Sequence, residues 1–157
     1  MLASASPRRA ELLRSVGLDF DVVPADIDET VRPGELPATY VTRLSAEKAR
    51  VVAGQVGPDV LVVAADTTVD VDGQILEKPR DVADARRMLG LLSGRIHFVH
   101  TGVTVVSLGP GPVVPRTETI VVETAVEFVE LTSATLEWYV ATAEPFDKAG
   151  AYAIQGL

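Results

Sequence analysis

The sequence predicts an α/β protein in which helices pack on a β-sheet. Helix-like and strand-like hydrophobic patterns alternate along the 157 residues, and this alternation is typical of layered α/β folds. No internal repeat, low-complexity tract or convincing linker interrupts the alternation. A chain of this length can bury roughly two thirds of its unfolded surface in one core. We therefore expect a single domain over residues 1–157.

The first helix is expected to begin after Ser6 and to run to about Val16, where Gly17 can end it. A serine oxygen can accept an N-terminal backbone N–H, the proline that follows suits the first helical position, and glycine commonly ends helices. Arg8 and Arg9 then fall in the first turn. A cation at that end of the helix dipole is disfavoured by roughly 0.3–1 kcal/mol. We therefore expect the two arginines to serve an anion that the sequence does not supply.

The periodicity of apolar residues, the capping residues and the turn residues predict the remaining helices and strands. Strands are expected over 20–23, 59–66, 69–75 (a hairpin turning at Asp72-Gly73), 96–108 and 117–131, with a loop over 109–115. Helices are expected over 38–54, 81–92 (begun by Asp81 and closed near Gly94) and 132–143 (stopped before Pro145). The strand over 59–66 is apolar on both faces, which is typical of a central strand.

One lysine breaks the pattern of the helix over 38–54. Val41, Leu44, Val51 and Val52 fall on one apolar stripe at 3.6 residues per turn, and Lys48 lies in its middle. A lysine at such a position is costly unless its ammonium reaches an anion or water. The stem could pack with its head in solvent, or the ammonium could meet an anion, and the sequence leaves both interpretations open.

Composition narrows the class of protein. The net charge is −8, with 14 Lys and Arg against 22 Asp and Glu, so a nucleic-acid partner is not expected. The absence of cysteine removes thiolate nucleophiles and cysteine-based zinc sites, and it fits a reducing cytoplasm. The apolar runs are too short to span a bilayer, and the N-terminus lacks the order of a signal peptide. We expect a cytoplasmic protein with no membrane partner.

Carboxylates stand at two informative positions. Asp66 is expected at the carboxyl end of a buried strand, where open α/β sheets place ligands, although aspartate is also an ordinary turn residue. Asp26, Asp28 and Glu29 form an acidic cluster after the first short strand. Most such clusters are solvated loops, but hard oxygen ligands beside a phosphate are also what Mg²⁺ requires.

The other polar residues are less informative. Lys78 and Lys148 could each be surface decoration, and His97 and His100 are expected on opposite strand faces, as structural residues that share no metal. Together, the arginines, lysines and carboxylates fit a site that binds a polyphosphate. The cations would hold the phosphates, the carboxylates would bind a metal ion, and a water molecule would attack phosphorus. Because neither GxxxxGK[ST] nor GxGxxG occurs, side chains and the first helix would hold the phosphates.

Six motifs together resemble a known family. The stretches LASASPRR, DIDE, EKA, AADTTV, EKP and DKAGAYAIQG occur in the order and approximate spacing of the Maf family of nucleoside triphosphate pyrophosphatases. The resemblance covers essentially the whole chain. It implies an α/β fold of the inosine-triphosphatase type, with an elongated mixed β-sheet flanked by helices and a cleft between two lobes.

The resemblance also implies a reaction and a set of site residues. The family hydrolyses a nucleoside triphosphate between the α and β phosphates with Mg²⁺ or Mn²⁺, giving a monophosphate and pyrophosphate. Its functional positions correspond here to Ser4, Arg8, Arg9, Glu29, Lys48, Asp66, Lys78 and Gln155. We expect Arg8, Arg9 and the first helix to bind the triphosphate, and Lys48 and Lys78 to neutralise the leaving pyrophosphate. Asp66 and Glu29 would position the metal or accept a proton from water.

Substrate preference follows from three positions. The branch of the family that prefers dTTP and UTP has arginine after Ser-Pro, threonine after the aspartate and glutamine in the IQG motif; this sequence has Arg8, Thr67 and Gln155. A glutamine amide donates and accepts at once, which matches the carbonyl and imide N–H of uracil or thymine. We therefore expect Thr67 and Gln155 to read the base. Modified pyrimidine nucleotides could enter the same pocket, since a methyl group changes binding by only about 1–3 kcal/mol.

Two departures and one rival interpretation accompany the resemblance. Glu77 precedes Lys78 where the family usually has glycine, and the family's C-terminal strand and helix would follow the point where this chain stops. The family is also associated with septum formation and cell division, so a nucleotide-binding regulator without turnover is the alternative. Such a module would not need both Asp66 and Glu29, which favours the enzyme. The resemblance further suggests a homodimer.

Overall fold

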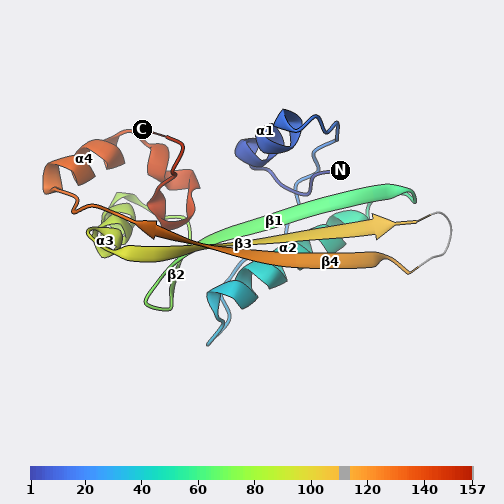
Figure 1. The fold of residues 1–157 in the computed structure, drawn as a ribbon, viewed down its shortest axis with the longest axis horizontal. Helices are drawn as coiled ribbons and strands as arrows, with labels where there is room; N and C mark the ends of the chain where they lie inside the picture. Colours follow the sequence, from blue (N-terminus) through green and yellow to red (C-terminus); the bar gives the residue numbers. More distant parts are fainter. Residues whose placement is uncertain (110–113, 157) are drawn as a thin grey trace. The chain divides into compact units, whose positions relative to one another are not determined.

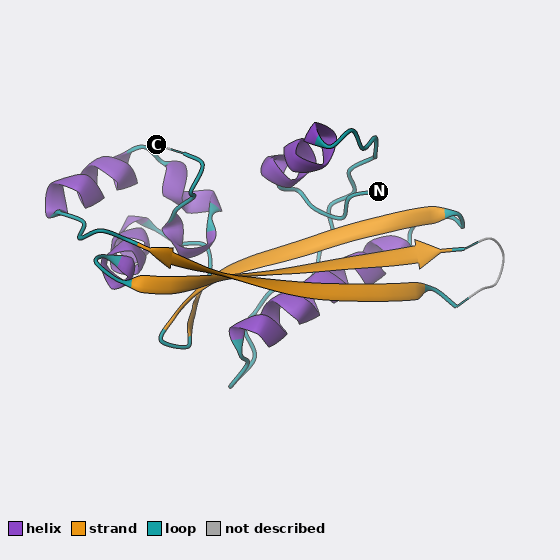
Figure 2. Ribbon diagram, in the orientation of Figure 1, coloured by secondary structure: helices purple, strands orange, loops and turns teal. Residues whose placement is uncertain are grey.

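The computed structural model describes residues 1–109 and 114–156, and it confirms the α/β class (Figure 1). Contacts divide the chain into two units, a first of Met1–Asp66 with Thr101–Val121 and a second of Thr67–His100 with Val122–Leu157. The elements are α1 Pro7–Ser15, α2 Pro37–Ala53, β1 Val60–Val71, β2 Gln74–Leu76, α3 Val82–Leu92, β3 Ile96–Leu108, β4 Arg116–Glu127, α4 Ser133–Ala141 and two short 3₁₀ helices, η1 Glu144–Asp147 and η2 Ala149–Ala151 (Figure 2).

The sheet has the strand order β2-β1-β3-β4. β1 and β2 form the expected antiparallel hairpin, in which Asp72 and Gly73 both have positive φ, at 54° and 79°. A two-residue hairpin turn of this kind requires positive φ at both positions, which Asp-Gly supplies. Leu2 adds isolated parallel bridges to Val22 and to Val63 of β1.

Three strand predictions need correction. The expected strand over 20–23 is reduced to the single bridge at Val22. β1 does not stop at Asp66 but runs on to Val71, because the β-branched pattern continues past the aspartate. β4 ends at Glu127, four residues before the expected end at 131. Of the loop expected over 109–115, residues 110–113 lie outside the described residues.

In the first unit, α2 packs on the sheet through its apolar stripe. Val41, Leu44 and Val52 are fully buried, whereas Val51, expected on the same stripe, is 37% exposed. α2 comes closest to β3 at Gly102, where an added Cβ would lie 2.4 Å from the Val41 carbonyl oxygen. Only glycine permits this approach, so the helix backbone is held directly against the strand.

In the second unit, α3 and α4 cover a separate apolar core that includes Val69, Leu76 and Leu89. Asp81 caps α3 as predicted, since its side chain accepts a hydrogen bond from the Asp84 N–H at 2.8 Å. Lys148, which the sequence left as possible surface decoration, is instead buried. Its ammonium donates to the Glu144 carbonyl and, at 2.6 Å, to the Asp147 carboxylate.

Both histidines lie in the second unit and are buried, in agreement with the structural role predicted for them. His97 Nε2 lies 2.6 Å from the Tyr152 hydroxyl, and burial lowers the pKa of His97. His100 lies between two carboxylates, 3.6 Å from Asp70 through Nε2 and 3.7 Å from Glu123 through Nδ1. These carboxylates are at opposite edges of the ring, so they cannot join His100 on one metal ion.

β4 forms an edge of the sheet and is exposed along almost its whole length. Ile120 and Val122 at its centre are 62% and 52% exposed. Glutamates stand on both sides of this apolar centre, at positions 118, 123 and 127. Within the described part of the chain, no helix has the length and apolar character that crossing a membrane requires.

Candidate functional site

The centre of the candidate site is Lys48, whose ammonium meets two carboxylates. Its Nζ lies 2.6 Å from Asp66 Oδ1 and 2.8 Å from Glu29 Oε1. The side chains of Lys48 and Asp66 are only 10% and 9% exposed, whereas that of Glu29 is 45% exposed. The lysine on the apolar stripe therefore reaches an anion rather than solvent. We call Glu29, Lys48 and Asp66 the lysine–carboxylate cluster.

Asp66 enters this cluster from within β1 and not from a strand end. Burial raises the pKa of Asp66 above its ordinary value, while the charges of Lys48 and Arg9 oppose that rise. Carboxyl groups with a pKa perturbed by burial and by nearby charges are common at functional sites.

Arg9 lies beside the cluster and is fixed by β1 and by the N-terminal segment. One of its guanidinium nitrogens, Nη1, donates to the Ala65 carbonyl at 2.7 Å and to the Ser4 hydroxyl at 3.2 Å. Burial lowers the pKa of Arg9, and the negative charges of Asp66 and Glu29 oppose that effect. Arg8 and Arg9 are both partly buried in the first turn of α1, and these hydrogen bonds tie Arg9 to Ser4 and to β1.

The start of α1 differs from the prediction in one respect. Ser6 occupies the N-cap position, but its side chain makes no capping hydrogen bond. Its backbone N–H donates instead to the Ser4 hydroxyl at 3.2 Å, so Ser4 joins the first turn to Arg9. The structure therefore brings together five of the predicted site residues, namely Ser4, Arg9, Glu29, Lys48 and Asp66.

Of the other predicted site residues, Arg8 belongs to the first unit with these five, and the remaining three belong to the second unit. Thr67 follows Asp66 directly in β1, is partly buried, and begins the second unit. Lys78 and Gln155 are exposed residues of the second unit. The roles of Lys78 and Gln155 therefore remain predictions.

Sequence reasoning missed two residues of α2 that contact the loop containing Glu29 and Thr30. Tyr40 donates its hydroxyl hydrogen bond to the Glu29 carbonyl at 2.9 Å, and Arg43 donates to the Thr30 carbonyl at 3.1 Å. Their spacing could have indicated a shared role, since Tyr40 and Arg43 lie one helical turn apart on the helix that carries Lys48.

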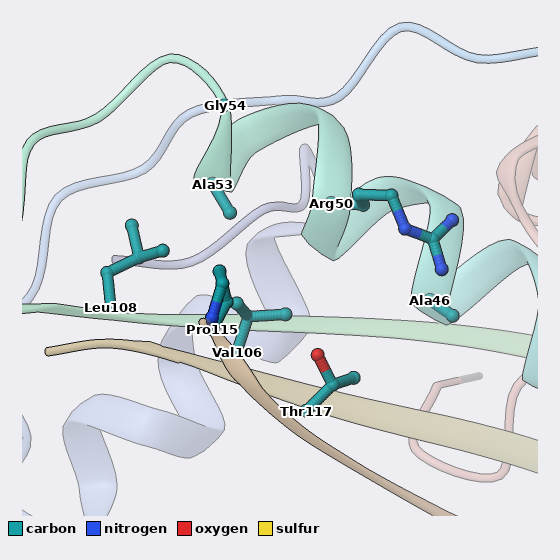
Figure 3. Close-up of a pocket in the computed structure, with 8 residues that line it drawn as sticks. All are labelled: Ala46, Arg50, Ala53, Gly54, Val106, Leu108, Pro115 and Thr117. Atoms are coloured by element: carbon teal, nitrogen blue, oxygen red, sulfur yellow. The ribbon is translucent and has the colours of Figure 1, made fainter. Parts of the chain in front are cut away.

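A pocket of about 350 Å³ lies elsewhere in the first unit (Figure 3). α2 lines one side of it, and the facing ends of β3 and β4 with the adjoining Pro115 line the other. Its lining is largely aliphatic, and Arg50 supplies the charge. Because none of the lining residues is a carboxylate, this pocket is not the place for the predicted metal chemistry.

Similar proteins were found by comparison with a family model, with curated proteins and with solved structures. The model of the Maf-like protein family matches residues 1–157. A dTTP/UTP pyrophosphatase of Syntrophus aciditrophicus is 49% identical over 157 residues, covering 100% of this chain and 74% of that protein. Proteins of the same name from Anaeromyxobacter sp. (strain Fw109-5) and Myxococcus xanthus are 54% and 51% identical, with 74% and 76% of their lengths covered. A solved dITP/XTP pyrophosphatase from Mycobacterium abscessus is similar with a TM-score of 0.43 and 18% identity, covering 79% of this chain and 68% of that one.

Proposed function

The chain belongs to the family of Maf-like proteins, and from this premise we propose that it hydrolyses dTTP and UTP to the monophosphate and pyrophosphate. Relatives at about half sequence identity carry the name dTTP/UTP pyrophosphatase. The observation that carries the proposal is the buried Lys48 ammonium held 2.6 Å from Asp66 and 2.8 Å from Glu29. A buried cation between two carboxylates is an unusual use of a helix face unless charged substrate groups are handled there.

Arg8 and Arg9 bind the triphosphate in this proposal, assisted by Ser4 and the N-terminus of α1. Their place in the first helical turn supports this role, because the dipole there already favours an anion. Arg9 is held by Ser4 and Ala65, so its charge is oriented before substrate arrives. Preorganised charge of this kind lowers the cost of binding a polyphosphate.

Lys48 and Lys78 neutralise the charge that develops as pyrophosphate leaves. Lys48 is suited to this because its ammonium is already held in place by two carboxylates. Asp66 receives a proton from the attacking water, assisted by Glu29. The raised pKa of Asp66 supports this assignment, since a general base works best when its pKa approaches the working pH.

Glu29 and Asp66 would hold the divalent metal ion, Mg²⁺ or Mn²⁺. Both carboxylates have one oxygen within 2.8 Å of the Lys48 ammonium, so two groups with hard oxygen donors lie beside one another. The described residues contain no group of three or more His, Cys, Asp or Glu that could hold an ion. Two carboxylates with water and substrate phosphate are nevertheless a common magnesium set. The bound ion would supply neutralisation of phosphate charge.

Thr67 and Gln155 read the base, and the amide of Gln155 pairs with the carbonyl and imide N–H of uracil or thymine. The same contacts would accept modified pyrimidine nucleotides, since an added methyl group changes binding by only about 1–3 kcal/mol. We place the reaction in the cytoplasm, in keeping with a chain that has no cysteine.

The test is pyrophosphate release from dTTP, UTP, CTP and GTP with Mg²⁺, with and without a chelator, for the wild type and for Asp66→Asn. We expect hydrolysis of dTTP and UTP above the others, loss of activity on chelation, and a fall in rate of roughly 10²–10⁴ for Asp66→Asn. Asp70→Asn is the matched control, because Asp70 is a partly buried aspartate of the same strand outside the cluster. Near-wild-type turnover by a folded Asp66→Asn would remove Asp66 from the mechanism. Tight nucleotide binding without turnover would make the protein a regulator.

A further inference from the structure

We propose that Tyr40 and Arg43 are positioning residues, which hold the main chain of the acidic loop so that the Glu29 carboxylate is presented beside Lys48. The acidic loop is defined as residues 28–35. This inference rests on the proposed function, because it assigns the two residues a part in the same reaction. Neither residue touches the reacting groups in this proposal, and both act through Glu29.

The acidic loop needs such support because regular structure does not supply it. Residues 24–36 contain neither helix nor strand, so no ladder of backbone hydrogen bonds fixes them. The Glu29 side chain is also 45% exposed, which leaves it little packing of its own. Segments with few buried contacts and no ladder open most easily. A carboxylate on such a segment is placed only if other groups hold its backbone.

Two side chains of α2 fix the loop backbone by hydrogen bonds to two consecutive carbonyl groups. The Tyr40 hydroxyl donates to the Glu29 carbonyl at 2.9 Å, and Tyr40 is only 3% exposed. Arg43 Nη2 donates to the Thr30 carbonyl at 3.1 Å. The two donors are three residues apart on one helix and therefore project from the same face. They fix the peptide on the carboxyl side of Glu29 and the peptide that follows it.

Arg43 is itself held rigidly. Its Nε and Nη2 donate to the two oxygens of Glu35 at 2.6 and 2.8 Å, and its guanidinium carbon lies 5.6 Å from the centre of the Tyr40 ring. These hydrogen bonds hold the pKa of Glu35 at about 2, well below its ordinary value. Glu35 also accepts from the Arg32 N–H at 3.0 Å. The Arg43 guanidinium therefore ties the middle and the C-terminal end of the acidic loop to the helix.

The same helix carries the partner of Glu29. Lys48 lies eight residues after Tyr40 in α2, and α2 is seated against β3 at Gly102. The Glu29 backbone and the Lys48 ammonium are therefore both positioned by the same helix, α2. This arrangement gives a physical account of how an exposed loop carboxylate comes to lie 2.8 Å from a buried ammonium.

The test is a double-mutant cycle on kcat/KM for dTTP hydrolysis with Mg²⁺, using Tyr40→Phe, Glu29→Gln and their combination. Tyr40→Phe removes only the hydroxyl, and we expect a loss of up to about tenfold, the size of one lost neutral hydrogen bond. In the Glu29→Gln background the same substitution should cost almost nothing further, because the group that Tyr40 positions has already been disabled. Ser45→Ala is the matched control, since it removes a buried hydroxyl of α2 that lies 2.9 Å from Thr104 and does not contact the acidic loop. Its effect should be the same in both backgrounds.

Hydrogen exchange over residues 26–36 gives a readout that does not depend on turnover. Exchange should rise in Tyr40→Phe and stay at the wild-type level in Ser45→Ala. Full additivity of Tyr40→Phe with Glu29→Gln, or unchanged exchange in Tyr40→Phe, would overturn the positioning role. If the wild type hydrolyses no nucleotide, the proposed function is refuted, and the role of Tyr40 in catalysis is refuted with it. Raised exchange in Tyr40→Phe would in that case still show that Tyr40 supports the loop.

Discussion

Replacing Lys48 with methionine removes the cation of the lysine–carboxylate cluster and keeps most of its side-chain length. Asp66 would remain 9% exposed and would lose the ammonium that now lies 2.6 Å away. Removing one partner of a buried ion pair costs roughly 3–5 kcal/mol. Arg9 also favours the ionised form of Asp66, so we expect a loss at the low end, about 3 kcal/mol. The pair with Glu29 adds at most about 1 kcal/mol, because Glu29 is 45% exposed.

The loss should appear in urea and thermal unfolding. Trp138 is the single tryptophan, so its fluorescence can follow the transition. A loss of about 3 kcal/mol in a chain of this length corresponds to a fall in Tm of roughly 6–12 °C. Arg50→Met is the control, since it removes an exposed cation from the same helix; it should cost less than about 1 kcal/mol. Lys48→Met combined with Asp66→Asn should recover much of the stability, because both buried charges are then absent.

The loss should also depend on pH. Burial raises the pKa of Asp66 in the folded state above its ordinary value of 3.8, and removal of Lys48 removes the largest opposing influence. The folded state then holds the Asp66 proton more tightly than the unfolded state does. The unfolding free energy of Lys48→Met should therefore be nearest to wild type below about pH 4 and fall as pH rises through the folded pKa. A loss under about 1 kcal/mol at pH 7 that is also independent of pH would refute the reasoning.

Two further predictions concern stability. Gly102→Ala would place a Cβ 2.4 Å from the Val41 carbonyl oxygen, and we expect a cost of about 1–3 kcal/mol in thermal unfolding. Gly90→Ala in α3, with nothing within 4 Å of the added carbon, should instead stabilise by up to about 1 kcal/mol; equal effects of the two would contradict the close approach at Gly102. The pKa of Glu35 is held at about 2 by Arg43, so Glu35 contributes stability that is present above its unfolded pKa and is lost as pH falls toward about 2. Glu35→Gln should therefore show a shallower loss of unfolding free energy between about pH 5 and pH 2 than the wild type, and parallel acid profiles would contradict this.

Features with local causes were predicted well from the sequence. The hairpin at Asp72-Gly73 and the capped start of α3 at Asp81 each depend on residues within a few positions of one another. Their backbone requirements are met by the residue types themselves, through positive φ in the turn and a side-chain acceptor at the cap. Such features can be predicted without knowing what packs against them.

Features that depend on distant partners were predicted incompletely. Ser6 has the right residue type for a capping role, but its N–H bonds to Ser4, which also accepts from Arg9. Lys48 could be recognised as anomalous from the helical period, yet its two carboxylate partners lie 18 and 19 residues away along the chain. The hold of Tyr40 on Glu29 was missed because nothing in a sequence pattern assigns a tyrosine hydroxyl to a main-chain carbonyl.

The exposed edge strand β4 has a consequence for how this protein behaves at high concentration. In the part of the chain that the structure describes, β4 is an edge strand, and its exposed Ile120-Val121-Val122 centre is a template for strand addition between copies. The glutamates at 118, 123 and 127 act as gatekeepers, since copies that stack edge to edge bring like charges together. Colloidal stability in this protein therefore depends on the charges of these three carboxylates, and replacing them with glutamine would remove the protection of the strand.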